Sequence, residues 1–207
     1  LFIPSTNGIV NTLKFDGTSV YVGGEFTNIG GQSRNRIAAL DPATGLATAW
    51  DPNANGSVFT IEKNGTTIYV GGLFTSIGGQ PRNFIAALNE SSGLATAWNP
   101  NANAQVYSIA VNSSDGIIYA GGLFTNIGGQ SRNRIAALKE ATGGAIATWN
   151  PSANSTVFSI AVSGGTVYIG GTFTNVAGQT RNCLAAIDSA GTATSWNPSE
   201  SAFGYIN

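Results

Sequence analysis

The chain has no histidine and no methionine, and its single cysteine is Cys183. Without histidine it lacks the side chain used most often as a general base and as a metal ligand near neutral pH. One thiol can form neither an intrachain disulfide nor a metal cluster. We therefore expect no metal site and no cofactor. The missing initiator methionine suggests a processed product or an excerpt of a longer chain.

Charge is also scarce. Charged residues make up 9% of the 207 residues, and nine basic side chains balance ten acidic ones. This composition predicts no basic patch for nucleic acid. No run of about 20 apolar residues occurs, so we expect no membrane insertion.

The carboxylates show no pattern typical of a catalytic site. One turn position is occupied in the four repeats by Asp41, Asn89, Lys139 and Asp188, so an acid is interchangeable there. Glycoside hydrolysis needs two fixed carboxyl groups on either side of one bond, and we can nominate none. We predict that the chain is not an enzyme and has no catalytic residues, with a fragment of a secreted hydrolase as a remote alternative.

What the sequence does contain is one unit that is repeated four times. The motif Tyr-x-Gly-Gly-x-Phe-Thr begins at Tyr21, Tyr69, Tyr119 and Tyr168, which gives spacings of 48, 50 and 49 residues. A period of this length is typical of solenoids, propellers and arrays. The chain is expected to be one repeat domain, residues 1–207, because each unit needs neighbours to bury its apolar face.

Each unit reads as four short antiparallel strands. In the second unit the predicted strands cover residues 58–61, 67–71, 84–88 and 94–98, and residues 78–83 form a loop. Four such strands in 40 to 50 residues predict an all-β, propeller-like fold of four blades, in a ring or an open arc. A β-solenoid is the alternative. The predicted blades are residues 9–52, 57–100, 105–151 and 156–198, with partial strands at 1–8 and 201–207.

The repeated string YxGGxFTxIGGQxRNxIAALxxxTGxAxxWNPxANxxV resembles the delta-60-type, propeller-like repeats of bacterial secreted and surface proteins. The resemblance covers essentially the whole chain. It implies an extracellular or cell-surface location and gives little information about function.

Arginine is the only basic residue present in all four units, at Arg34, Arg82, Arg132 and Arg181. A ring of guanidinium groups would suit anionic ligands. The alternative, which repetition favours, is that each guanidinium binds backbone carbonyls in the loop between the second and third strands.

Tryptophan closes the fourth predicted strand of each unit, at Trp50, Trp98, Trp149 and Trp196. These rings either pack between blades or stack on sugars. Four near-identical units therefore predict a structural or interaction module for adhesion or assembly, with a lectin-like propeller that binds glycans as the alternative. The expected partners are other copies of the chain or the rest of a larger parent chain. Apolar end strands such as Leu1 to Ile3 would need such a partner.

Overall fold

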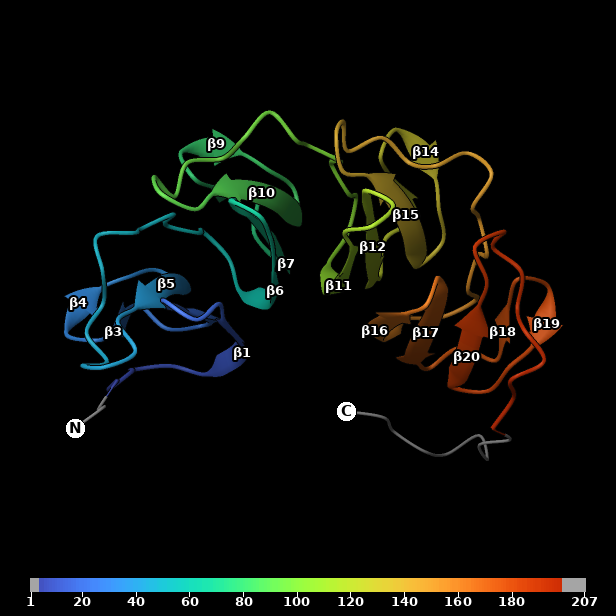
Figure 1. Cartoon of the computed structure of the whole chain (residues 1–207), viewed down its shortest axis with the longest axis horizontal. Coiled ribbons are helices and arrows are strands. Elements are labelled where there is room, and N and C mark those ends of the chain that lie inside the picture. The colour runs from blue at the N-terminus through green and yellow to red at the C-terminus, as the bar shows by residue number, and fades with distance from the viewer. Residues whose placement is uncertain (1–3, 199–207) are drawn as a thin grey trace. The chain divides into compact units, whose positions relative to one another are not determined.

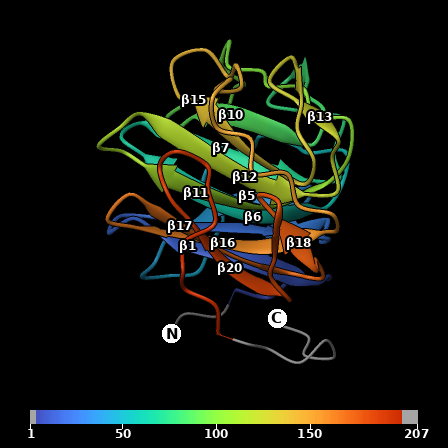
Figure 2. The same cartoon turned by 90° about the vertical axis from the view of Figure 1, so that its right-hand side faces the viewer.

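The computed structural model describes residues 4–198 and is drawn in Figure 1 and, turned by 90°, in Figure 2. The chain divides into two compact units, residues 1–99 and 100–207, and each unit contains two repeats. The described part of the chain contains no helix long and apolar enough to cross a membrane. The predicted strand at 201–207 lies outside the described residues.

Each repeat folds into one blade, a three-stranded antiparallel sheet whose middle strand ends in the Gly-Gly pair. The three strands of the four blades, in chain order, are β1 (Val10–Phe15), β2 (Val20–Gly24) and β5 (Ile37–Leu40); β6 (Val58–Asn64), β7 (Thr67–Gly72) and β10 (Ile85–Asn89); β11 (Val106–Asn112), β12 (Ile117–Gly122) and β15 (Ile135–Lys139); and β16 (Val157–Ser163), β17 (Thr166–Gly171) and β20 (Leu184–Ile187). Figure 2 shows β16, β17 and β20 as neighbouring strands of one such sheet.

The segment predicted as a loop contains a small hairpin in every blade. These hairpins are β3 (Asn28–Ile29) with β4 (Gln32–Ser33), β8 (Ser76–Ile77) with β9 (Gln80–Pro81), β13 (Asn126–Ile127) with β14 (Gln130–Ser131), and β18 (Asn175–Val176) with β19 (Gln179–Thr180). The fourth predicted strand is reduced to one bridge residue, as in Leu88 with Ala95. The Thr96 N–H, one residue after that bridge, also bonds to the carbonyl oxygen of Ala87 in the third strand.

The Gly-Gly pair fits two close contacts. In each blade the first and second strands pair with a register shift, such as the one between Val106 and Ser108. A Cβ atom on Gly122 would lie 2.1 Å from the carbonyl oxygen of Gln105 at this bulge. A Cβ atom on Gly121 would lie 2.7 Å from Val157 Cγ1 of the fourth blade. The pair therefore allows both the bulge and the approach of a neighbouring blade.

The segment between two blades is bound to the blade that follows it. Asn55 Oδ1 accepts hydrogen bonds from the N–H groups of Thr75 and Ser76, at 2.8 and 2.9 Å. Residues 4–8 bind the first blade in the same way, through Asn7 and the Thr6–Ile29 bridge. The prediction of a partial strand at 1–8 is therefore wrong for residues 4–8: a single bridge replaces it, because the asparagine side chain takes up the N–H groups that a strand would pair. Residues 1–3 lie outside the described part.

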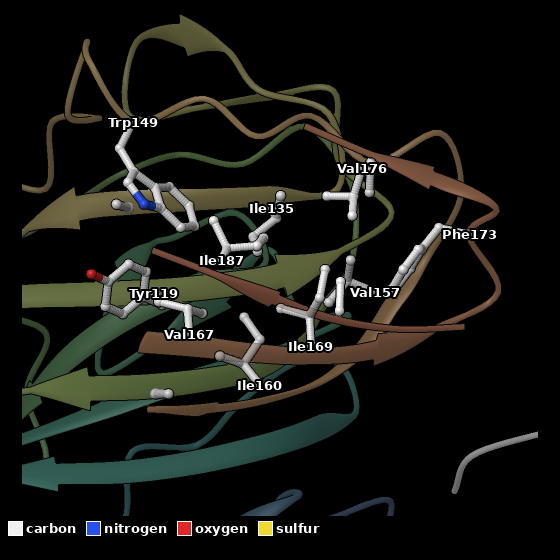
Figure 3. Close-up of a cluster of buried hydrophobic side chains, with 14 residues drawn as sticks. Tyr119, Ile135, Trp149, Val157, Ile160, Val167, Ile169, Phe173, Val176 and Ile187 are labelled. Atoms are coloured by element: carbon white, nitrogen blue, oxygen red, sulfur yellow. The ribbon is translucent and has the colours of Figure 1, made fainter. Parts of the chain in front are cut away.

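The core lies in the contact between neighbouring blades, here called the seam. In unit 2, Tyr119, Ile135 and Trp149 of the third blade pack on Val157, Ile160, Val167, Ile169 and Ile187 of the fourth (Figure 3). In unit 1, Tyr21, Ile37 and Trp50 of the first blade pack on the second blade in the same way. A phenylalanine and an aliphatic residue recur at fixed positions on the apolar-rich strands of each repeat, and this recurrence predicts that all eight are core residues. Seven of them are fully buried: Phe26, Phe74, Phe124, Phe173, Ile37, Ile85 and Ile135. Leu184 was predicted with them and is only half-buried, because it belongs to the open face of the fourth blade.

Candidate interaction site

The four repeated arginines have the same local geometry. Arg34 Nη1 donates to Ser33 O at 2.8 Å, and its Nη2 donates to Thr48 O at 2.6 Å. Arg82 and Arg181 bind the equivalent carbonyls. One carbonyl lies in the predicted loop and the other lies after the third strand. The guanidinium thus ties the hairpin to the segment that leads to the tryptophan, and a ligand role for the arginines stays a prediction.

Arg132 is the most deeply placed of the four, with 5% of its surface exposed. Its Nη2 donates to Gln130 Oε1 at 2.7 Å and to Ile146 O at 2.9 Å. Burial lowers the pKa of Arg132. Its Nε is buried without a hydrogen-bond partner in the described structure. The side chain therefore acts through its two outer nitrogens.

Replacing Arg132 with lysine should lower the free energy of unfolding by about 2 kcal/mol, because one ammonium group cannot reach the carbonyls on both segments. Arg34→Lys is the matched control, and it should cost less because Arg34 is only partly buried. Urea unfolding of both variants measures the difference. Equal stability of Arg132→Lys and the parent chain would contradict the structural role.

Three of the four tryptophans are buried, with 3–6% of their surface exposed: Trp50, Trp98 and Trp149. Each packs edge-to-face on the tyrosine of its own repeat, with ring centroids 5.1–5.2 Å apart. Trp50 Nε1 also donates to Asn89 O of the second blade at 3.2 Å, and Trp149 Nε1 donates to Asp188 O of the fourth blade at 3.0 Å. Trp50 and Trp149 thus take the first of the two predicted roles, packing between blades, and Trp98 packs on the tyrosine of its own repeat.

Trp196 differs, because 44% of its surface is exposed. Its partner Tyr168 is 36% exposed, and the two rings lie 5.5 Å apart in the usual edge-to-face pair. Together with the half-buried Leu184 they form what we call the aromatic face of the fourth blade. The face is equivalent to the Tyr119, Ile135 and Trp149 set that is buried one blade earlier, with leucine in place of isoleucine.

The first blade has an open groove of about 400 Å³, lined by Val10, Leu13, Val20, Val22, Ile29 and Leu40, with Pro4 and Thr6 at its edge. These residues match, at a spacing of 48, the buried Val58, Ile61, Ile68, Val70, Ile77 and Leu88 of the second blade. Leu13 is 64% exposed, whereas Ile61 is 2% exposed. The open groove is thus a seam surface without its covering blade. The sequence carries no signal for this groove, because its residues are apolar and stand at repeat positions that are buried in the second blade.

The seam in unit 1 also has a charged cluster. Lys63 Nζ lies 2.8 Å from both Asp16 Oδ2 and Glu90 Oε1, and the Lys14–Glu62 pair lies beside them at 2.5 Å. Burial raises the pKa of Asp16, but the bonds from Lys63 and from the Ser19 and Thr18 N–H groups outweigh it and hold the pKa well below its usual value. Hydrogen bonds to Asp16 and Glu90 raise the pKa of Lys63. Burial and Glu90 raise the pKa of Tyr21 to about 12.

These shifts predict a stability maximum between about pH 4 and 10. The interactions of ionised Asp16 stabilise the fold above the pKa that Asp16 has in the unfolded chain, and this stabilisation is lost as the pH falls through its folded-state pKa. The stabilisation linked to the raised pKa values of Lys63 and Tyr21 is lost as the pH rises above about 10. Lys63→Met should lower stability by about 1 kcal/mol at pH 7 and flatten both limbs. Urea unfolding from pH 2 to 11 tests this, and an unchanged pH profile of Lys63→Met would contradict it.

Within the described residues, no three His, Cys, Asp or Glu side chains are grouped so as to hold a metal ion. The repeated sheets and seams define the chain as a propeller-type repeat protein. A family model described as "Domain of unknown function (DUF5122) beta-propeller" matches residues 19–43, 67–92, 113–138 and 165–193, more than half of the chain. The chain belongs to this family. No curated protein matches it.

Two solved structures of designed proteins are similar. The computationally designed Ika8 protein matches 89% of this chain with a TM-score of 0.57 and 13% identity. This chain covers 47% of Ika8, and so spans about half its length. The computationally designed Ika4 protein matches 87% of this chain with a TM-score of 0.56 and 13% identity, and this chain covers 91% of Ika4. At such identity the likeness shows the fold alone.

Proposed function

We propose that this chain is a non-catalytic structural and interaction module whose binding surface is the open groove of the first blade. The observation that carries the proposal is the match between the groove and the buried seam surface of the second blade. An apolar groove that is open to solvent, with Leu13 64% exposed at it, is suited to contact with another surface. The repeated arginines and three of the tryptophans are engaged in structural contacts, which supports a scaffold over an enzyme.

The proposed setting is extracellular or at the cell surface, where the module would serve adhesion or assembly. This part of the proposal rests on the resemblance to delta-60-type repeats of bacterial secreted and surface proteins. A low charge content and a polar surface of Asn, Ser, Thr and Gln suit such a setting.

Dye binding to dilute chain tests whether the groove binds apolar groups. ANS, which fluoresces on exposed apolar surface, should bind the parent chain, and Leu13→Asp should lose most of that signal. Leu46→Asp is the matched control, because Leu46 is 57% exposed on the same blade but does not line the groove. Equal dye binding by both variants would contradict the proposal.

A lectin-like function is kept as a second candidate because Tyr168 and Trp196 expose an aromatic pair on which a sugar ring could stack. A glycan array with the parent chain and with Trp196→Ala tests it. The lectin proposal requires a glycan signal that the variant loses, and an array without signal contradicts it.

A further inference from the structure

The open groove and the aromatic face are the two halves of one kind of seam. In unit 1 the groove-type surface of the second blade is covered by Tyr21, Ile37 and Trp50. In unit 2 the equivalent surface of the fourth blade is covered by Tyr119, Ile135 and Trp149. On the first blade the groove-type surface is open, and on the fourth blade the covering set, Tyr168, Leu184 and Trp196, is exposed.

We infer that the aromatic face of one copy binds the open groove of a second copy, so that the chain assembles head to tail through a seam like those inside each unit. The inference rests on the proposed function of the groove and names its partner. It is heterologous, because two different surfaces of the chain meet.

The internal seams specify how the copies fit. Trp50 and Trp149 each donate Nε1–H to the carbonyl oxygen of the residue that follows or ends the third strand of the next blade, Asn89 and Asp188. The equivalent residue on the first blade is Asp41, whose carbonyl oxygen accepts one bond, from Gly45 N–H at 2.8 Å. Asn89 and Asp188 also accept the equivalent glycine N–H bond beside the tryptophan bond. In the proposed contact, Trp196 Nε1–H of one copy therefore donates to the carbonyl oxygen of Asp41 in the second copy.

The charged cluster does not oppose this contact. In unit 1 the cluster joins Asp16 and Lys63, but the first blade has Phe15 where the second has Lys63, so no charge of the open groove would be buried without a partner. The seam in unit 2 already shows that the charges are not needed, since Asn112 and Val162 stand there at the positions equivalent to Asp16 and Lys63. The new seam would be of this uncharged type.

Two variants separate the halves of the contact. Leu13→Asp places a charge in the groove and leaves the aromatic face intact, while Trp196→Ala removes the main ring of the face and leaves the groove intact. Both side chains are exposed in the single chain, so both variants should fold. Leu46→Asp and Phe158→Ala are matched controls at exposed positions outside the two surfaces.

Analytical ultracentrifugation gives the decisive result. The parent chain and both controls should form dimers or longer assemblies, each test variant alone should weaken association at least about thirtyfold, and a mixture of the two test variants should form a 1:1 complex and nothing larger. A mixture that stays monomeric, or a parent chain that does so, overturns the head-to-tail inference. If ANS binding still depends on Leu13 in that case, the groove function stands without the second copy, and if ANS binding is also unaffected, both proposals fail.

Discussion

Phe124→Ala is expected to lower the free energy of unfolding by about 3–5 kcal/mol. Phe124 has no exposed surface, and it is one of four phenylalanines in the same place of each blade. Its carbonyl oxygen also accepts the N–H of Arg134, where the chain enters the third strand. Truncation would leave a cavity at the point where the hairpin, the middle strand and the third strand meet. Urea unfolding followed by circular dichroism measures the loss.

Phe158→Ala is the control for this prediction, since it removes the same ring from the same unit at a position 42% exposed. It should cost about 1 kcal/mol or less, because Phe158 keeps much of its surface in solvent and packs on Tyr107 with ring centroids 5.3 Å apart. A Phe124→Ala chain as stable as the parent would show that the blades are aligned wrongly.

Gly122→Ala is expected to cost about 3 kcal/mol. The new Cβ atom would lie 2.1 Å from Gln105 O, and the same contact occurs at 2.0–2.2 Å in the other blades, at Gly24, Gly72 and Gly171. Because the obstacle is backbone, the bulge between β11 and β12 has to open. Thermal and urea unfolding would both show the loss.

Gly144→Ala is the matched control, because the nearest atom to its Cβ would be Thr142 Oγ1 at 3.4 Å. Its stability should stay within about 0.5 kcal/mol of the parent. If Gly122→Ala behaved like Gly144→Ala, the Gly-Gly pair would have to be explained by something other than the bulge.

The spacing of the repeated motif and the alternation of apolar residues along the strands were enough to predict the all-β fold, the four blades and most of the core. Phe173 and Ile135 stand at positions that recur in every repeat and both lie in the seam of unit 2, so the repeat itself identifies them. The structural use of arginine could also be predicted, since a side chain needed in every unit most often serves the unit.

Other features had no signal in the sequence. Arg36, Phe84, Arg134 and Cys183 all have left-handed backbone, with φ of 63–66°, although neither glycine nor asparagine stands there. The repeats also could not show that Trp196 and Leu13 differ from their copies. That difference depends on whether a neighbouring blade covers them, which is a tertiary contact between residues far apart in the sequence.

The seam also determines how long a blade waits for its packing partner during synthesis on the ribosome. Trp50 and Trp149 each complete their indole hydrogen bond with a residue 39 positions later in the chain. At about 5–20 residues per second, translation takes about 2–8 s to deliver that partner. The first or third blade, once it has emerged, therefore exposes its tyrosine and tryptophan for seconds, until the following blade has been synthesised. Slow codons or pauses after each tryptophan would lengthen the interval in which two nascent chains can pair by mistake.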